Sequence, residues 1–293
     1  MVRISVTGAN GQLGKEIRNI HKDYAGIEFT FYTRTELDIT NKDSLKKLKE
    51  SKCDALINCA AYTAVDLAED EIDKAYAINL HAVGNLADYC KNNNCTLIHV
   101  STDYVYGESN TPHKEYGNIN PLSIYGKSKW EGEEIIRSTL SNYYILRTSW
   151  LYSSFGNNFV KTMRRLAVEK NFLTVVNDQK GSPTYARDLA KGIMHVIVTK
   201  LSNITGNKKE YGTYNFSNRG ATTWYEFAKK IIHKSDPDFP IYPVTSDEFV
   251  TKAKRPEYSV LDCSRFENTF AYKIREWEKA LEECLELLNV EST

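Results

Sequence analysis

The chain has 293 residues, of which 41% are hydrophobic and 26% are charged, a composition typical of a globular protein with a sizeable core. Lysine and arginine number 38, and aspartate and glutamate also number 38, so the formal net charge is zero. This balance gives no overall field that would attract nucleic acid or an anionic membrane surface, and no apolar run reaches the roughly 18 to 20 residues that span a bilayer. We therefore expect a cytoplasmic protein that binds neither nucleic acid nor membranes.

Short β-branched runs alternate with helical stretches in the first half of the chain. Strands are expected at residues 4–7, 28–32, 55–59, 96–100 and 143–146, and helices over 11–22, 44–50 and 72–92 and from about Tyr125. Strands that alternate with helices pair in parallel through right-handed crossovers. The order predicts an α/β fold with a Rossmann-like, doubly wound parallel sheet. His99, inside one of the apolar strands, is expected to be a core histidine.

The regular alternation of strands and helices ends after Arg147. Helices are expected near 159–170, 186–199, 223–234 and 274–288, strands at 173–176 and 213–216, and a loop rich in Gly, Asn and Lys at 203–212. We interpret residues 1–150 as one domain and residues 151–293 mainly as a smaller α/β cap. The stretch of about 185–212 is expected to pack back onto the sheet of the first domain.

A glycine-rich turn follows the first strand and reads Gly8-Ala9-Asn10-Gly11-Gln12-Leu13-Gly14. Glycines at these positions permit a tight turn and a close backbone approach to a pyrophosphate, while the start of the next helix supplies oriented N–H groups. The position of the turn between a strand and a helix indicates a dinucleotide site. Residues 1–150 are thus predicted to form an NAD(P)-binding domain.

The end of the second strand bears on the choice of dinucleotide. Proteins that select NAD usually place an acid there for the adenosine ribose, but this chain reads Tyr32-Thr33-Arg34-Thr35. Arg34 suits a 2′-phosphate, which favours NADPH and leaves NADH as the alternative; Arg34 as a solvated loop charge is the other interpretation. Asp38, further along, is a candidate for a hydrogen bond to the adenine amino group.

Tyr125 and Lys129 lie four residues apart at the start of a predicted helix, so both side chains lie on one face. A cation near a phenol stabilises the phenolate, and we expect Lys129 to lower the pKa of Tyr125 in this way. Thr102 ends the fourth strand, where parallel sheets place their ligands, and is expected to lie beside Tyr125 above the nicotinamide. The three residues form a candidate catalytic set for proton transfer to a substrate oxygen.

With these motifs the sequence resembles the extended short-chain dehydrogenase/reductases, and within them the dTDP-4-dehydrorhamnose reductase family, over nearly its full length. The resemblance rests on the glycine turn, on Tyr125 and Lys129, and on the following segments: 58–66 with Ala68-Glu69, 101–107, 147–152, 178–179, 181–184, 255–256 and 259–262.

The resemblance implies a set of site residues. Those implied to contact the cofactor are Gly11, Gln12, Leu13, Asp38, Ile39, Ala61, Tyr62, Thr63, Tyr125 and Lys129. The full expected set also includes Gly8, Asn10, Gly14, Arg34 and Ala60. Thr102, Asp103 and Trp150 are expected to contact a deoxyhexose, with Tyr104 nearby. Trp150 as a buried anchor between the domains is the alternative.

Other expectations concern anions and metals. A nucleotide diphosphate needs cations or N–H donors, and Arg255 is the preferred cap residue for that role. Leu67 departs from the family, which commonly has a basic residue there. Some members bind magnesium through glutamates at a dimer contact, and Glu16 matches one of these. We predict no metal site from the residues themselves and keep Mg²⁺ and a homodimer as options that the resemblance raises.

The resemblance implies reduction of the 4-keto group of dTDP-4-dehydro-L-rhamnose by NADPH to give dTDP-L-rhamnose, the last step of dTDP-rhamnose biosynthesis. The pair Asp103-Tyr104 lacks the glutamate with which related dehydratases eliminate water, which favours simple carbonyl reduction. Two alternatives stay open. One is another nucleotide-sugar 4-reductase or an epimerase, and the other is a non-catalytic regulatory subunit similar to the methionine adenosyltransferase β subunit.

Overall fold

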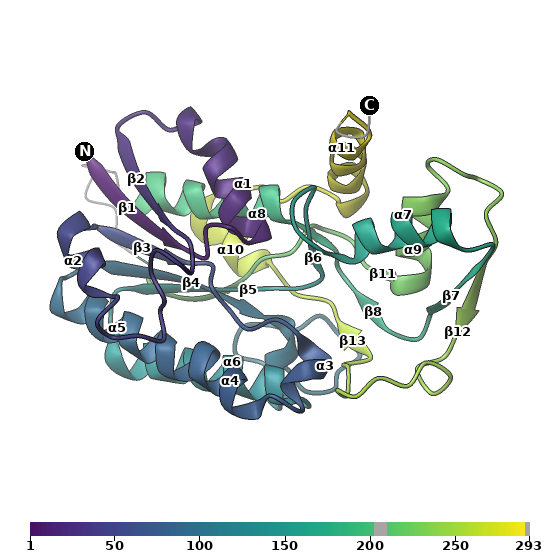
Figure 1. Cartoon of the computed structure of the whole chain (residues 1–293), viewed down its shortest axis with the longest axis horizontal. Coiled ribbons are helices and arrows are strands. Elements are labelled where there is room, and N and C mark those ends of the chain that lie inside the picture. The colour runs from purple at the N-terminus through teal and green to yellow at the C-terminus, as the bar shows by residue number, and fades with distance from the viewer. Residues whose placement is uncertain (202–209, 291–293) are drawn as a thin grey trace.

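Six parallel strands form the central sheet of the protein, which a computed structural model describes over residues 1–201 and 210–290 (Figure 1). The order across the sheet is β10-β5-β4-β3-β1-β2, and every neighbouring pair is parallel. The strands are β1 (Val2–Thr7), β2 (Ile27–Tyr32), β3 (Ala55–Asn58), β4 (Thr96–Thr102), β5 (Tyr143–Thr148) and β10 (Gly212–Asn215). The predicted doubly wound sheet is confirmed.

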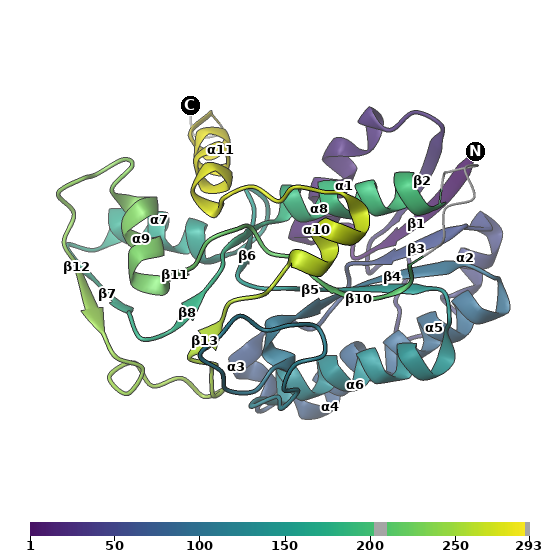
Figure 2. The ribbon, with the colours of Figure 1, turned by 180° about the vertical axis from the view of Figure 1, so that it is seen from behind.

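Helices cover both faces of this sheet, as the view from behind also shows (Figure 2). One face carries α1 (Gln12–Ile20), α8 (Ala186–Val196) and α10 (Ser264–Phe270). The other carries α2 (Lys46–Ser51), α5 (Ala82–Asn92) and α6 (Ile124–Thr139), with the short α3 (Val65–Ala68) and α4 (Ile72–Tyr76) beside α6. Strands buried on both faces need nearly continuous apolar runs, which β3 supplies with four buried residues in a row.

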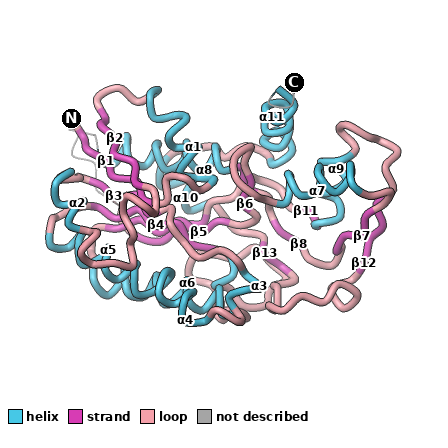
Figure 3. The backbone as a smooth tube through the Cα atoms, viewed as in Figure 1, coloured by secondary structure: helices cyan, strands magenta, loops and turns pink. Residues whose placement is uncertain are grey.

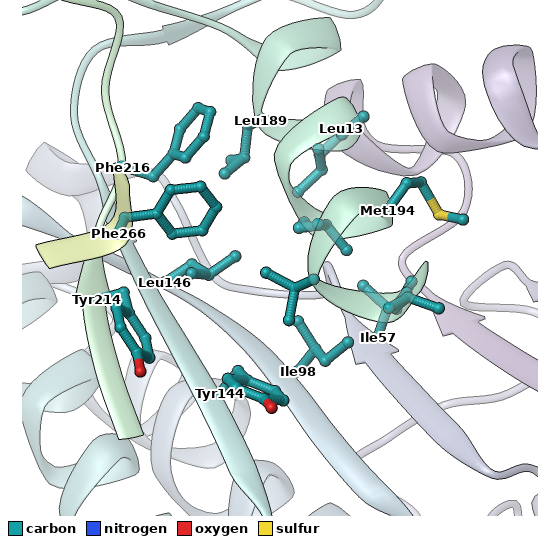
Figure 4. Close-up of a cluster of buried hydrophobic side chains, with 14 of the residues drawn as sticks. Leu13, Ile57, Ile98, Tyr144, Leu146, Leu189, Met194, Tyr214, Phe216 and Phe266 are labelled. Atoms are coloured by element: carbon teal, nitrogen blue, oxygen red, sulfur yellow. The ribbon is translucent and has the colours of Figure 1, made fainter. Parts of the chain in front are cut away.

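The core on the α1 and α8 face joins strand residues to both helices (Figure 4). Ile57, Ile98 and Leu146 come from neighbouring strands, and Leu13 and Leu189 come from the covering helices. All are buried to 5% exposure or less. This packing fixes the start of α1 against the sheet, which places the glycine turn at the carboxyl end of the strands.

The second part of the chain has its own core and small sheets. Its helices are α7 (Phe159–Glu169), α9 (Trp224–Ile232) and α11 (Trp277–Val290). Its strands are β6 (Leu151–Tyr152), β7 (Leu173–Val176), β8 (Lys180–Gly181), β9 (Thr184–Tyr185), β11 (Thr222–Thr223), β12 (Ile241–Val244) and β13 (Tyr258–Ser259). A long loop runs from β12 back towards α3 and β13 and so returns to the first part (Figure 3).

Several elements differ from expectation in detail. The helix expected over 72–92 is interrupted by a π-helical turn at Ala77–His81, and a second π-helical turn, Ile197–Leu201, ends α8. Single 3₁₀ turns lie at His21–Asp23 and Asp103–Val105. β10 and α10 also return to the sheet, so the returning segments extend beyond the expected 185–212. Residues 203–209 of the expected loop lie outside the described residues. No helix in the described ranges is long and apolar enough to cross a membrane.

Candidate active site

The glycine turn has the geometry that its sequence predicts. Gly8 adopts a positive φ of 68°, and a Cβ there would lie 2.6 Å from the backbone nitrogen of Ala60. A Cβ on Gly14 would lie 2.4 Å from the carbonyl oxygen of Gly8. Only glycine fits either position, because the surrounding atoms are backbone and cannot move aside. The turn therefore brings the start of α1 close to the strand ends and leaves its first N–H groups open to a phosphate.

A cavity of about 260 Å³ lies directly over this turn. Eight of the residues expected to bind the cofactor line it, namely Gly8, Asn10, Gly11, Arg34, Asp38, Ile39, Ala60 and Ala61. They come from four separate segments, at the ends of β1, β2 and β3 and in the loop that contains Asp38. The residues present thus fit the adenosine and pyrophosphate end of a dinucleotide.

Two charged residues, Asp38 and Arg34, border the cavity. One carboxylate oxygen of Asp38 accepts hydrogen bonds from the backbone N–H of Thr40 at 3.0 Å and from its hydroxyl at 2.7 Å. These bonds hold the pKa of Asp38 below its usual value, so the side chain is an anion that can only accept. Arg34 is exposed at the cavity wall, where a 2′-phosphate would meet it.

Seven expected cofactor residues lie outside the lining of this cavity: Gly14 in the turn, Tyr125 and Lys129 on α6, and the four described next. The Leu13 side chain is in the core, so only its backbone can face a phosphate. Gln12 accepts a hydrogen bond from Asn158 at 2.9 Å. The Tyr62 hydroxyl donates to Glu71 at 2.7 Å, while the adjacent Thr63 is exposed.

Thr102 and Tyr125 meet at the carboxyl end of β4. Ser123 caps α6 by accepting from the N–H of Gly126 at 3.2 Å, which fixes Tyr125 in the first helical turn. Burial raises the pKa of Tyr125 above its usual value, while a hydrogen bond with the Thr102 hydroxyl opposes this. Tyr125 is therefore a neutral phenol near neutral pH, a group able to donate a proton. The structure thus brings the two side chains together, and their catalytic role above a nicotinamide stays a prediction.

Lys129 has different partners from those expected. Its Nζ lies 2.6 Å from the carbonyl oxygen of Val100 and 3.1 Å from Nε2 of His99, so both hydrogen bonds given for it in the described residues go to β4 and neither goes to the Tyr125 hydroxyl. Burial dominates the pKa of Tyr125 in this structure, and Lys129 is not among the groups that shift it, so the expected lowering by Lys129 stays a prediction. Burial also lowers the pKa of Lys129 to about 8.

Asp103 and Tyr104 follow Thr102 in a 3₁₀ turn. The Thr102 hydroxyl donates to Asp103 Oδ1 at 3.0 Å, while Oδ2 of Asp103 is buried and meets no hydrogen-bond partner of good geometry in the part of the chain that the structure describes. Burial raises the pKa of Asp103 to about 6. The Tyr104 ring packs edge-on against Tyr125, with 5.5 Å between ring centroids. Its hydroxyl accepts from Arg255 at 3.1 Å, which ties the cap to the candidate catalytic residues.

A larger cavity of about 770 Å³ lies in the cap, and Arg255 forms part of its wall. Its other lining residues include Phe159, Met163, Leu166, Lys170, Leu173, Val175, Gln179, Trp224, Phe249 and Thr251. Arg255 also donates to Asp66 at 2.6 Å, so a diphosphate would compete with that carboxylate. The sequence patterns did not single out the cavity walls, because α7, β7 and α9 are far apart in the chain.

Trp150 stacks on Trp224 with 3.5 Å between ring centroids and an angle of 10°. A Cβ on Gly181 would lie 2.4 Å from the Trp150 indole, so the glycine makes room for the ring. Trp150 has a φ of +48°, which aims its side chain into the cap. One indole face is thus covered, and Trp224, which also lines the larger cavity, is an aromatic residue that the sequence alone did not identify.

The residues around Glu16 do not fit a magnesium ion. Glu16 is fully buried, and its two oxygens accept from Ser153 at 2.6 Å and from Arg187 at 3.0 Å. A guanidinium occupies the side that a cation would need. No group of three or more metal-ligating side chains occurs among residues 1–201 and 210–290. The magnesium option has no support here.

Comparisons with known proteins agree with this site. The family model of the RmlD substrate binding domain matches residues 2–290. A dTDP-4-dehydrorhamnose reductase from Aggregatibacter actinomycetemcomitans is 40% identical over 96% of this chain and 97% of its own. A solved structure of such a reductase from Clostridium acetobutylicum has a TM-score of 0.91, 41% identity, and coverage of 98% of this chain and all of that one.

A third relative bears on the cofactor. The structure of dTDP-4-dehydrorhamnose reductase from Bacillus anthracis str. Ames was solved in complex with NADP, and it has a TM-score of 0.89 and 39% identity over 97% of this chain and 99% of that one. The matches span both parts of the fold, including the glycine turn and the cap. The chain therefore belongs to the dTDP-4-dehydrorhamnose reductase family, within the extended short-chain dehydrogenase/reductases.

Proposed function

We propose that the protein uses NADPH to reduce the 4-keto group of dTDP-4-dehydro-L-rhamnose to dTDP-L-rhamnose. The observation that carries this proposal is the buried pair Thr102 and Tyr125 at the carboxyl end of the sheet. On one side, Tyr125 packs in a cluster with Tyr62 and Ile78, and Ile78 lines the dinucleotide cavity. On the other side, the pair is linked to the cap through Tyr104 and Arg255. A carbonyl between a dinucleotide and a sugar-nucleotide site would meet these hydroxyls.

Tyr125 is the proton donor in this proposal. Burial keeps its phenol protonated at neutral pH, so it can give its hydrogen to the oxygen of the carbonyl as negative charge develops there. Thr102 orients that oxygen when its buried hydroxyl turns its one hydrogen from Asp103 Oδ1, which accepts it at 3.0 Å, to the substrate. NADPH, when bound, supplies the hydride that reduces the carbon.

The dinucleotide is held by the glycine turn and its neighbours. Gly11 and the first turn of α1 face the pyrophosphate, Arg34 pairs with the 2′-phosphate, and Asp38 accepts from the adenine. Lys129, buried beside the sheet, is the residue that holds the nicotinamide end of the dinucleotide. Preference for NADPH over NADH rests on Arg34, a cation where NAD-selective sites hold an acid.

The sugar nucleotide is assigned to the cap, over residues 151–293 apart from the segments that return to the sheet. The cavity of about 770 Å³ is walled mainly by apolar and aromatic groups, which suit a nucleobase, and Arg255 lies between it and Tyr104. Asp103 and Trp150 face the sugar in this proposal, and one buried oxygen of Asp103 has no hydrogen-bond partner of good geometry among residues 1–201 and 210–290. The bound diphosphate replaces Asp66 as the ion-pair partner of Arg255.

The test is to follow nicotinamide absorbance with purified protein, NADPH and enzymatically prepared dTDP-4-dehydro-L-rhamnose. The expected result is one NADPH consumed per dTDP-L-rhamnose formed, identified by proton NMR of the product. A different 4-hydroxy product, or turnover only with another 4-keto sugar nucleotide, would move the protein to the alternative reductases. No NADPH oxidation, together with copurification with a synthetase, would favour a regulatory subunit.

A further inference from the structure

A chain of buried polar side chains leads from Lys129 into the sheet. Nζ of Lys129 lies 3.1 Å from Nε2 of His99, and Nδ1 of His99 lies 3.0 Å from Nδ2 of Asn58. Thr7 donates its hydroxyl to Oδ1 of Asn58 at 2.7 Å. All four side chains are at most 1% exposed. Because water does not reach these groups, their donors and acceptors have to match one another.

The orientation of Asn58 follows from its backbone neighbour. The N–H of Ala60 donates to Oδ1 of Asn58 at 3.2 Å, and a backbone amide nitrogen can only donate. Oδ1 therefore faces Ala60, and the Nδ2 amide hydrogens face His99. Since an amide nitrogen does not accept, Nδ1 of His99 has to accept and carries no hydrogen.

This arrangement fixes the hydrogen on the other ring nitrogen of His99. A neutral imidazole with a free Nδ1 carries its hydrogen on Nε2, and this hydrogen points at Lys129. An ammonium group has no lone pair with which to accept it. A neutral amine can accept from Nε2 and still donate to the carbonyl oxygen of Val100 at 2.6 Å. The network is thus fully matched only when Lys129 is neutral.

The charges around Lys129 agree with this geometry. Burial lowers the pKa of Lys129 to about 8, and Glu133, one turn along the same helix, opposes the shift. That carboxylate is engaged by Arg147 and Arg137, and the phenol four residues before Lys129 is uncharged. From β4 the facing group is His99, and burial holds its pKa well below the usual value, so the imidazole is neutral.

We propose that His99 is a positioning residue for the reduction, because it donates its Nε2 hydrogen to Lys129 and so disfavours the ammonium form of Lys129 in the ligand-free protein. The kinetic part of this inference rests on the proposed function. Reduction needs a cation near the phenolate that Tyr125 leaves behind, so kcat/KM falls as the pH rises and Lys129 loses its proton. Through its effect on the protonation of Lys129, His99 determines the alkaline pH at which kcat/KM falls.

The first test reads the hydrogen positions without any turnover. In ligand-free protein labelled with ¹⁵N-histidine, the signals of His99 are identified by their loss in His99→Gln. The expected result is a bare Nδ1 and a protonated Nε2 from about pH 6 to pH 9. A hydrogen on Nδ1, or an imidazolium anywhere in this range, would overturn the proposal. This result stands even if the protein reduces a different sugar nucleotide.

The second test measures the pH dependence of kcat/KM. In His99→Gln the amide oxygen can accept from an ammonium, so the alkaline limb is expected to move up by about one pH unit. Asn58→Asp should move it in the same direction, because a carboxylate would accept a hydrogen from Nδ1 and leave Nε2 free to accept from Lys129. The matched control is His195→Gln, in which the lost partner is the carbonyl oxygen of Phe270.

In His195→Gln, the alkaline pH at which kcat/KM falls is expected to be the same as in the wild type. An unmoved limb in folded His99→Gln and folded Asn58→Asp would contradict the proposal. If His99→Gln does not fold, Asn58→Asp carries the kinetic test, and the NMR measurement on the wild type still decides where the hydrogens lie.

Discussion

Arg147, at the end of β5, is fully buried and should be among the most sensitive positions of the fold. Its guanidinium donates to Glu133 at 2.6, 2.9 and 3.2 Å, to the Tyr106 hydroxyl at 2.8 Å and to the carbonyl oxygen of Glu115 at 2.8 Å. Glu133 is also fully buried. We predict that Arg147→Met, which keeps much of the side-chain volume, strongly destabilises the protein because it leaves the Glu133 carboxylate with too few partners.

Removing one partner of a buried ion pair costs about 3–5 kcal/mol. Arg137 also contacts Glu133 and stays in place, so the lower end, about 3 kcal/mol, applies. For a protein of this size, about 3 kcal/mol lowers Tm by about 6–12 °C. Replacing both members, as in Arg147→Met with Glu133→Leu, removes the uncompensated charge and should recover most of that loss.

Thermal unfolding of the wild type, the single variant and the double variant, followed by circular dichroism, is the assay. A Tm for Arg147→Met within about 1 °C of the wild type would refute the reasoning, as would a double variant no more stable than the single one.

The pH dependence gives a second readout of the same pair. In the wild type, burial raises the pKa of Glu133, but Arg147 outweighs this and holds the pKa below its usual value. The stabilisation from Glu133 is therefore present above the unfolded-state pKa and is lost as the pH falls through the folded one. In Arg147→Met, burial is less opposed and the pKa of Glu133 rises. The difference in Tm between the two proteins should shrink as the pH falls from about 7 to about 4.

Three further substitutions test the ligand sites. Arg34→Ala should raise KM for NADPH by about ten- to a hundredfold, because a charge-assisted bond to the 2′-phosphate is lost, and should leave KM for NADH nearly unchanged; an equal effect on both would contradict the role of Arg34. Arg255→Ala should raise KM for the sugar nucleotide about tenfold or more without changing KM for NADPH, and steady-state kinetics with each ligand varied would detect the opposite pattern. Gly181→Ala should cost about 1–3 kcal/mol of stability, because its Cβ would lie 2.4 Å from Trp150, and an unchanged Tm would contradict that contact.

The sheet and much of the site could be predicted because their signals are local. Alternating strands and helices are sufficient for a doubly wound sheet, and the glycine turn, Thr102 and Tyr125 lie at strand ends or helix starts that the sequence marks. Eight of the expected cofactor residues line one cavity, because parallel strands all end at the same edge of the sheet.

The rest depends on contacts between distant segments. Lys129 and His99 are 30 residues apart, and Arg255 reaches Asp66 across 189 residues, so no spacing rule could pair them. His99 was correctly expected in the core, but its role as a partner of Lys129 follows only from the side-chain geometry. The return of β10 to the sheet likewise depends on tertiary packing beside β5.

The central claim is that Tyr125 protonates the carbonyl oxygen of a bound sugar nucleotide. The most direct measurement is the single-turnover rate of NADPH oxidation by Tyr125→Phe with dTDP-4-dehydro-L-rhamnose, alongside Tyr116→Phe, which changes an exposed tyrosine. We expect Tyr125→Phe to lose about a hundredfold or more in rate while its affinity for NADPH stays within about threefold of wild type, and Tyr116→Phe to behave as wild type. A Tyr125→Phe variant that reduces the substrate at close to the wild-type rate would contradict the account.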